Sequence, residues 1–231
     1  MSRSSIADNL ASVRDRIHRA AIAASRDPSE IRLIAVSKTK PPLAIREAYE
    51  AGQRLFGENY AQELAQKADE LVDLHDIEWH FIGHLQTNKA KYVARAAHVV
   101  HTVDSAALAR ELGKRVAKDD HRREGFRMPV LVEVNVGAEP QKHGTSPAEL
   151  GDILDAVDKE PALQLRGLMT MPPHDLEAAR RVFEALVSLR RLHGGRARLP
   201  ELSMGMSDDL EVAIACGATL VRVGSAIFGS R

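Results

Sequence analysis

The sequence predicts an α/β protein built as one (β/α)8 TIM barrel, with an extra helix before the first strand. Short runs rich in β-branched and apolar residues alternate with helical stretches, a pattern typical of a parallel sheet. The chain holds eight such runs within 231 residues, a length common for one closed barrel. No G-x-G-x-x-G turn follows the first run, which disfavours an open doubly wound sheet.

The first expected element is an amphipathic helix near the N-terminus. Ile6, Leu10, Val13 and Ile17 are spaced so that they share one helical face. The Asp-Pro pair that ends at Pro28 stops this helix before the first strand.

Eight strands are expected after this helix, each followed by a helical stretch. The strands are Ile31–Ser37, Arg54–Gly57, Glu78–Ile82, His98–Thr102, Val130–Asn135, Leu165–Met169, Glu201–Met204 and Thr219–Val223. The helical stretches include Pro42–Ala51, Ala61–Leu74, Ser105–Ala117 and Leu176–Leu192. Residues 1–231 are expected to form a single domain, because no linker or low-complexity tract interrupts them. We expect the charged segment 119–127 to be a solvated loop without a function.

Composition excludes several classes of function. The chain has 32 basic and 32 acidic residues, so no global field favours nucleic acid or a membrane surface. No apolar run approaches the ~20 residues that span a bilayer, and the first residues lack the apolar core of a secretory signal. A cytoplasmic protein is therefore expected. Cys216 is the single cysteine, which excludes an internal disulfide, and we expect it to be a small core residue.

Lys38 is the first candidate site residue. It closes the apolar strand IRLIAVSK, and in this fold function gathers at the C-terminal ends of the strands. Desolvation would lower the pKa of its amine, and a neutral amine is the nucleophile that forms a Schiff base. The alternative is a lysine that extends into solvent at the barrel rim, and position alone leaves both open. Lys40 is expected to be a loop lysine.

The loops after the last two strands predict a phosphate site. They read SMGMSDD, with Gly205 and Ser207, and RVGSAIFG, with Arg222, Gly224 and Ser225. These two loops form the recurrent phosphate site of (β/α)8 barrels. Glycines let backbone N–H groups approach an anion, and the serine hydroxyls add donors. The alternative is a pair of ordinary glycine turns.

These two predictions point to one ligand, because the eighth and first strands are neighbours in a closed barrel. The ligand would carry both a carbonyl and a phosphate, as pyridoxal 5'-phosphate does and as the sugar-phosphate substrate of a class I aldolase does. Arg222 favours pyridoxal phosphate, since a fixed cation at the end of the eighth strand could meet the pyridine nitrogen.

The sequence also resembles a known family, the pyridoxal phosphate homeostasis proteins of the YggS/PROSC type. The resemblance covers nearly the whole chain and is carried by AVSKTKP, FGENY, WHFIGHLQTNK, RGLMTM, LSMGMSDD and VRVGSAIFG, in this order. The expected fold and the RVGSAIFG turn also resemble the barrel domain of alanine racemases. Those enzymes have a second, mostly β domain in addition.

The resemblance implies roles for particular residues. Lys38 corresponds to the lysine that forms the Schiff base, Arg222 to the arginine at the pyridine nitrogen, and Asn59 to a polar contact of the cofactor. Lys142, after the fifth strand, matches a lysine implicated in cofactor handling. Family members usually carry a serine directly after the asparagine that corresponds to Asn135. This chain has Val136 there, so no role for a side-chain hydroxyl is carried over.

The remaining implied contacts surround the phosphate. Ser207, Gly224 and Ser225 match the phosphate contacts of the family, and Met204 and Gly205 are expected to line the same pocket. Together with Lys38, Asn59 and Arg222 they form the expected cofactor-binding set.

We expect a binding protein that stores, buffers or delivers pyridoxal phosphate without robust turnover. Arg222 would keep the pyridine nitrogen unprotonated and so make the ring a poorer electron sink. Lys38 could serve one face of a substrate α-carbon, and Tyr60, the nearest candidate for the other face, is expected to be structural. A weak monomeric amino-acid racemase and a Schiff-base aldolase are the alternatives. The expected partners are PLP-dependent apoenzymes, and the expected state is a monomer.

Overall fold

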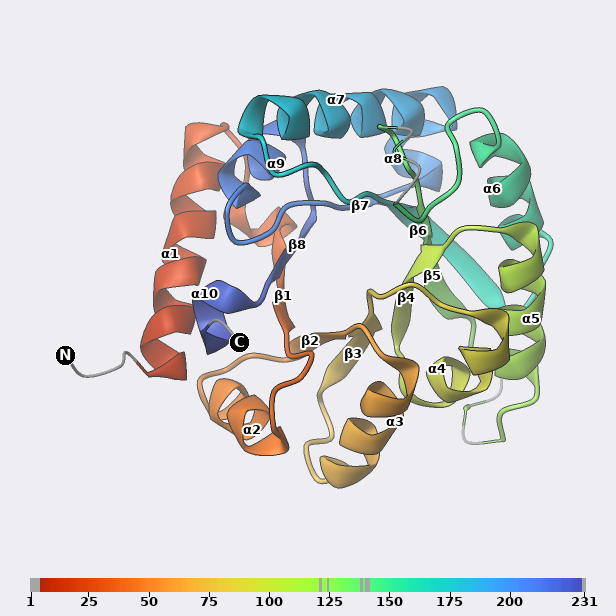
Figure 1. Ribbon diagram of the computed structural model, residues 1–231, viewed down its shortest axis with the longest axis horizontal. Coiled ribbons are helices and arrows are strands. Elements are labelled where there is room, and N and C mark those ends of the chain that lie inside the picture. Colours follow the sequence, from red (N-terminus) through yellow and green to blue (C-terminus); the bar gives the residue numbers. More distant parts are fainter. Residues whose placement is uncertain (1–4, 121, 124, 138, 140–141, 230–231) are drawn as a thin grey trace.

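The computed structural model shows eight parallel strands closed into a barrel in the order β1 to β8 (Figure 1). It describes residues 5–120, 122–123, 125–137, 139 and 142–229. The strands are β1 (Arg32–Val36), β2 (Leu55–Glu58), β3 (Glu78–Phe81), β4 (Val99–Val103), β5 (Met128–Glu133), β6 (Leu163–Met169), β7 (Glu201–Ser203) and β8 (Leu220–Val223). The predicted fold class is confirmed.

Helices form the outer layer around the barrel (Figure 1). They are α1 (Ile6–Ala23), α2 (Pro42–Glu50), α3 (Ala61–Glu70), α4 (Ala90–Ala96), α5 (Ala106–Ala117), α6 (Leu150–Asp158), α7 (Leu176–Leu192), α8 (Gly195–Arg198), α9 (Leu210–Cys216) and α10 (Ser225–Phe228). Short 3-10 turns occupy Pro28–Glu30 and Thr87–Lys89. Across the described residues, no helix combines the length and the apolar character needed to cross a membrane.

The predicted N-terminal helix is present as α1 and begins with a capping box. Ser5 accepts a hydrogen bond from the Asp8 N–H, and the Asp8 carboxylate accepts from the Ser5 N–H. Its buried face carries Leu10, Val13 and Ile17, as the spacing predicts. Figure 1 shows α1 standing outside the barrel beside α9 and α10, the helices that flank β8.

Most predicted boundaries agree with the structure to within two residues. The largest strand shift is in β5, which begins and ends two residues earlier than predicted. The helix expected over 61–74 ends at Glu70, so it was predicted four residues too long. Part of segment 119–127 falls outside the described residues. In the rest of it Arg122 docks on α4 and donates to the Ala94 and Ala97 carbonyls, so this residue does not belong to a solvated loop.

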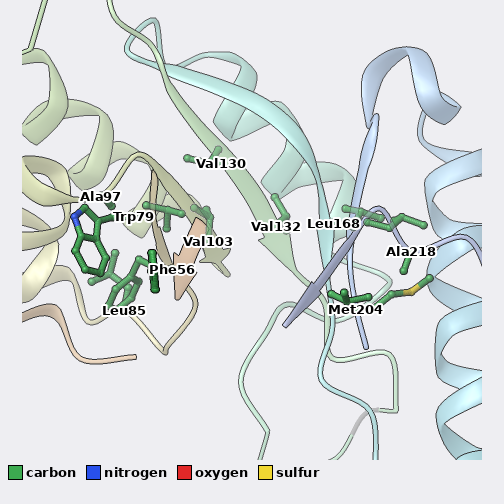
Figure 2. Packing of buried hydrophobic residues seen from close by; sticks show 14 of the residues in the cluster. Phe56, Trp79, Leu85, Ala97, Val103, Val130, Val132, Leu168, Met204 and Ala218 are labelled. Atoms are coloured by element: carbon green, nitrogen blue, oxygen red, sulfur yellow. The ribbon is translucent and has the colours of Figure 1, made fainter. Parts of the chain in front are cut away.

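The main hydrophobic core lies between the strands and the outer helices. Figure 2 shows part of it, with Phe56, Trp79 and Leu85 grouped on one side of the view. The Phe56 and Trp79 rings are tilted at 47° with centroids 5.9 Å apart, a favourable aromatic geometry. This layer holds each helix against its strand and thereby fixes the loops at the barrel mouth.

A second, smaller cluster fills part of the barrel interior. Its buried members come from strands alone, namely Ile34, Val99, Leu131, Met169 and Leu220. Side chains alternate along a strand, so residues two positions from these point inward as well. Several of those positions are polar, which makes the interior of this barrel chemically mixed.

The packing of α1 gives the first testable prediction. Leu10→Ala should lower the free energy of unfolding by about 2–5 kcal/mol, because the Leu10 side chain is fully buried and truncation leaves a cavity. The measurement is equilibrium unfolding in denaturant. Leu43→Ala is the matched control, since Leu43 is 66% exposed, and it should change stability far less. Equal effects of the two substitutions would contradict the docking of α1.

Candidate functional site

A cavity of about 290 Å³ opens among the C-terminal ends of the strands, where sequence analysis expected the site. Six of the eight expected cofactor-binding residues line it, contributed by β8 and by the loops that follow β1, β2, β7 and β8. They are Lys38, Asn59, Ser207, Arg222, Gly224 and Ser225. The rest of the wall is mixed. It holds the apolar Val36, Ile82, Met171, Pro173 and Met206 and the polar His174, Asp208 and Asp209.

Lys38 follows β1 directly, and the backbone on both sides of it is held by side chains of α3. The Lys67 ammonium donates to the Ser37 carbonyl at 2.7 Å, and the Thr39 N–H donates to Glu63 at 2.6 Å. Thr39 has a φ of 62°, a left-handed conformation that a β-branched residue rarely adopts. These contacts fix the place from which the Lys38 side chain starts.

The anchor beneath Lys38 is a buried cluster of charges. Lys67 is 4% exposed, and its ammonium lies 2.7 Å from both Glu58 and Glu63. Glu58 also accepts a hydrogen bond from the Ser37 hydroxyl at 2.7 Å. Burial raises the pKa of the Glu58 carboxyl, and the Lys67 charge opposes that rise. Removing one member would leave the others buried without full compensation.

Two loops meet on the other side of the cavity to form a polar cradle. The Ser207 and Ser225 hydroxyl oxygens are 3.1 Å apart, although 18 residues separate them in the sequence. A Cβ at Gly224 would lie 3.2 Å from the Val36 carbonyl oxygen, so glycine allows this turn to pack closely against β1. The two hydroxyls gathered at this glycine turn can donate to an anion.

The N-terminal helix α1 holds both halves of this cradle. Arg16 donates to the Ser207 carbonyl at 2.9 Å and forms an ion pair with Glu211 of α9. The Asn9 amide donates to the Ile227 carbonyl of α10 at 2.8 Å. The helix that precedes the barrel therefore supports the loops that follow the last two strands.

Arg222 brings a buried guanidinium to the cavity from β8. It is 3% exposed, and it donates to the Ser203 hydroxyl at 2.7 Å and to the Thr170 carbonyl at 3.0 Å. Its second nitrogen also lies 3.1 Å from the Met171 sulfur. Burial lowers the pKa of Arg222 to about 10, so the group stays positively charged at neutral pH.

Two acidic residues near Arg222 were missed in the sequence. Glu133, at the end of β5, is 6% exposed, and one of its carboxylate oxygens has no hydrogen-bond partner among the described residues. Burial, with repulsion from Asp104, raises the pKa of Glu133 to about 7, and Arg222 opposes this. Asp209 is also buried, and its charge favours the charged form of Arg222. Side chains two positions apart on a strand point to the same side, so the inward position of Leu131 could have predicted an inward position for Glu133.

Asn59 reaches the cavity from the loop after β2. Its side-chain oxygen is buried and has no hydrogen-bond partner among the described residues. A Cβ at Gly83 would lie 2.1 Å from the Asn59 carbonyl oxygen, so only glycine fits beside this turn. A buried amide oxygen without a partner is suited to accept a hydrogen bond from a ligand.

Met204 and Gly205 lie behind the cavity wall. The Met204 side chain is fully buried in the outer core, near Ala218 in Figure 2. Gly205 has a φ of 95° and a carbonyl that accepts from the Arg222 N–H, and a Cβ there would come within 2.6 Å of the Ala213 Cβ. Neither residue is among those that line the cavity, and the Cβ position of Gly205 faces Ala213 and Leu210 of α9.

Two further residues from the sequence analysis lie at the rim. Lys142 pairs with Glu139 and donates to the Met171 carbonyl at 3.3 Å, beside a residue of the cavity wall. Tyr60 is 53% exposed and does not line the cavity. His174, which does line it, was not singled out in the sequence.

Comparisons with known proteins identify relatives of this chain. A family model described as "Alanine racemase, N-terminal domain" matches residues 2–231. The chain is 46% identical to the "Pyridoxal phosphate homeostasis protein" of Escherichia coli K12, over 98% of this chain and 97% of that protein. The structure of PipY from Synechococcus elongatus with PLP bound superposes with a TM-score of 0.81 at 40% identity, over 97% of this chain and all of that one.

A more distant likeness concerns the fold alone. Alanine racemase from Corynebacterium glutamicum superposes with a TM-score of 0.66 at 18% identity. This chain is covered over 98% of its length, and the racemase chain over 61%. The rest of the racemase chain has no counterpart in the residues of this chain that were superposed.

The raised pKa of Glu133 yields a prediction about stability and pH. The folded chain binds this proton more tightly than the unfolded chain, whose carboxyl titrates near 4.5, so stability falls as pH rises from there to about 7. Glu133→Gln removes this titration. Relative to the unchanged protein, its free energy of unfolding should rise between roughly pH 5 and pH 8, by up to about 3 kcal/mol.

Denaturant unfolding at several pH values measures this difference. Glu47→Gln on α2 is the control, since Glu47 is an exposed carboxyl, and it should follow the unchanged protein at every pH. Parallel pH curves for Glu133→Gln and the unchanged protein would show that Glu133 does not titrate in this range.

Proposed function

Because the chain belongs to the alanine racemase N-terminal domain family, and within it to the pyridoxal phosphate homeostasis proteins, we propose that it binds pyridoxal 5'-phosphate and takes part in intracellular PLP homeostasis. In this proposal the protein stores, buffers or delivers the cofactor, held as a Schiff base on Lys38. Residues 1–231 act as one binding domain.

One observation carries the proposal. The pairing of β8 with β1 puts Lys38, Arg222 and the turn at Gly224 on the wall of a single cavity. An amine, a buried cation and an anion cradle are the three features that an aldehyde, a pyridine nitrogen and a phosphate require. Pyridoxal phosphate carries all three groups, whereas a phosphosugar has no pyridine nitrogen for the buried guanidinium to meet.

The residues present fit the cofactor. Ser207, Ser225 and the Gly224 backbone would hold the phosphate, and the Asn59 amide lies in the same wall as a polar contact for the cofactor. Arg222 would face the pyridine nitrogen, and Lys38 would bond the aldehyde carbon. Met204 and Gly205 would shape the turn from behind. Lys142 would act at the rim, beside Met171.

Arg222 supports binding rather than turnover. Bound pyridoxal phosphate supplies a reactive aldehyde and an electron-withdrawing ring, and the ring withdraws electrons best when its nitrogen is protonated. Arg222 remains a cation at neutral pH even with its lowered pKa, so it disfavours a second positive charge beside it. We therefore propose a non-enzymatic role, with PLP-dependent apoenzymes as recipients.

The balanced charge of the chain supports the rest of the assignment. The chain carries equal numbers of basic and acidic residues, which gives no general attraction to nucleic acid or to a membrane surface. A monomer located in the cytoplasm is the state we propose.

A weak amino-acid racemase is the second candidate, favoured by the fold shared with alanine racemase. Racemisation needs acid–base groups on both faces of the α-carbon. Lys38 could serve one face of the α-carbon. Tyr60 is exposed and does not line the cavity, so it is not placed to serve the other face. In deuterated water, alanine enantiomers incubated with the loaded protein should exchange their α-hydrogen no faster than with the cofactor alone. Fast exchange with loss of optical activity would establish the racemase.

Lys38 provides the direct test of binding. Adding pyridoxal phosphate to the purified protein should give a visible absorbance band, and borohydride should fix the cofactor to the peptide that contains Lys38. Lys38→Ala should abolish both signals and leave the unfolding transition nearly unchanged, because a half-buried lysine after a strand contributes little packing.

Lys40→Ala is the matched control for this test. Lys40 lies two residues further along the same loop and donates to the Phe228 and Gly229 carbonyls. The Lys40→Ala protein should keep the absorbance band and the labelled peptide. A reducible adduct found mainly at another lysine would refute the assignment of Lys38, and a protein that stays colourless with added cofactor would refute the binding function.

A further inference from the structure

A column of polar side chains runs through the barrel interior, below the cavity. Arg222 donates to the Ser203 hydroxyl at 2.7 Å, and Ser203 lies 2.8 Å from Nδ1 of His101. Nε2 of His101 lies 2.8 Å from Nδ1 of His80, and Nε2 of His80 lies 3.0 Å from the Glu78 carboxylate. Ser203, His101 and His80 have no exposed surface.

The lower end of this column sets which way its protons point. Nε2 of His80 lies 3.0 Å from the Glu78 carboxylate, within ion-pair distance although outside hydrogen-bond geometry, so the negative charge favours a proton on Nε2 of His80. In the neutral ring Nδ1 of His80 then accepts, and His101 must donate from Nε2. That leaves Nδ1 of His101 as the acceptor for the single hydroxyl proton of Ser203.

The upper end is compatible with the same direction. The Arg222 guanidinium can only donate, so the Ser203 oxygen accepts from it, and the single Ser203 hydroxyl proton stays available for Nδ1 of His101. With Nδ1 of His101 as an acceptor, Ser203 and His101 therefore have one consistent arrangement. Burial lowers the pKa of His101 well below its usual value, and the neighbouring His80 and the positive charges of Arg222 and Arg32 act in the same direction, which keeps the His101 ring neutral.

The lower end is held by alternating charges on three other strands. Arg32 of β1 lies 3.8 Å from Glu78 and 2.9 Å from Glu201 of β7. Arg166 of β6 lies 3.2 Å from the same Glu201 oxygen. Glu78 therefore keeps its negative charge at the far opening of the barrel, opposite the cavity.

We propose that Ser203, His101 and His80 are positioning residues, which form a one-directional hydrogen-bond chain that holds the Arg222 guanidinium towards the cofactor's ring nitrogen. This inference rests on the proposed binding of pyridoxal phosphate. It assigns the chain a task at the cavity, although none of the three residues lines it.

The chain matters because Arg222 has a competing neighbour. Glu133 is buried, its charge attracts Arg222, and one of its oxygens has no hydrogen-bond partner among the residues described. Thr170 and Met171 hold one guanidinium nitrogen, and Ser203 holds the other. An acceptor at Ser203 that is polarised by His101 keeps that nitrogen in place. Without it, the guanidinium is drawn to Glu133.

The first measurement needs no cofactor. Long-range nitrogen–proton NMR spectra of the cofactor-free protein distinguish the two neutral forms of a histidine ring. Both His80 and His101 should carry their proton on Nε2. In Glu78→Gln the preference of the His80 proton for Nε2 over Nδ1 should weaken, since a neutral amide favours a proton on Nε2 less strongly than a carboxylate does. A proton on Nδ1 of His101 in the unchanged protein would overturn the one-directional chain.

The second measurement uses the loaded protein and three substitutions. His101→Leu fills the site but removes the acceptor for Ser203, whereas His101→Asn offers an amide oxygen near the position of Nδ1. The rate of cofactor release should rise roughly tenfold in His101→Leu, close to the largest effect expected for one lost neutral hydrogen bond. His101→Asn should recover most of that loss. Leu131→Ala is the control, because it removes apolar packing from the same interior but no hydrogen-bonding group.

These outcomes separate a positioning role from a structural one. Equal release rates in His101→Leu, His101→Asn and Leu131→Ala would reduce the chain to packing and overturn the proposal. The absorbance spectrum across pH gives an independent readout, and it should shift in His101→Leu and stay unchanged in Leu131→Ala. If the unchanged protein binds no cofactor, the proposed function fails, while the NMR result still decides whether the chain has one direction.

Discussion

The closure of the barrel by β1 and β8 is the constraint on which the rest of the site depends. Their register pairs Ile34 with Arg222 and Ala35 with Val223, so residues nearly 190 positions apart become neighbours. Lys38 continues one of these strands and Gly224 the other. Because the outer helices pack on every strand, the distance between amine and anion cradle is set by the whole barrel. A local change in either loop cannot restore it once closure is lost.

Charged and polar side chains occupy part of the barrel interior in place of apolar ones. In many barrels of this class the inward layers are filled by branched apolar residues. Here apolar side chains such as Ile34, Leu131 and Leu220 share the interior with Arg222 and two buried histidines. A buried cation is costly unless it is hydrogen-bonded and compensated. Ser203, the Thr170 carbonyl and two nearby carboxylates meet that requirement, which explains why the polar groups occur together.

The sequence alone predicted the barrel, its eight strands and six residues of the cavity wall, because period and strand-end position carry that information. It did not predict the polar interior. Both faces of a strand in a closed barrel are buried, one by the helices and one by the opposite strands, so the apolar pattern does not say which face His80 or Glu133 occupies. Nor did it separate Met204 and Gly205 from the wall, since adjacent positions in one loop look alike in sequence. The buried Lys67 depends on a contact with another element, which no local pattern records.

The site combines a buried end with an open end, and this asymmetry bears on how a ligand could be exchanged. Arg222 is almost fully buried and its contacts are fixed by strands, whereas Ser225 is exposed and Ser207 is half-buried. The cradle owes its shape to contacts from outside the barrel, where Arg16 and Asn9 of α1 hold its two loops. Such contacts at the surface can open without disturbing the strands. A ligand with its ring in the buried interior and its phosphate at the exposed mouth would be recognised at one end and released from the other, which suits a protein that takes part in cofactor homeostasis.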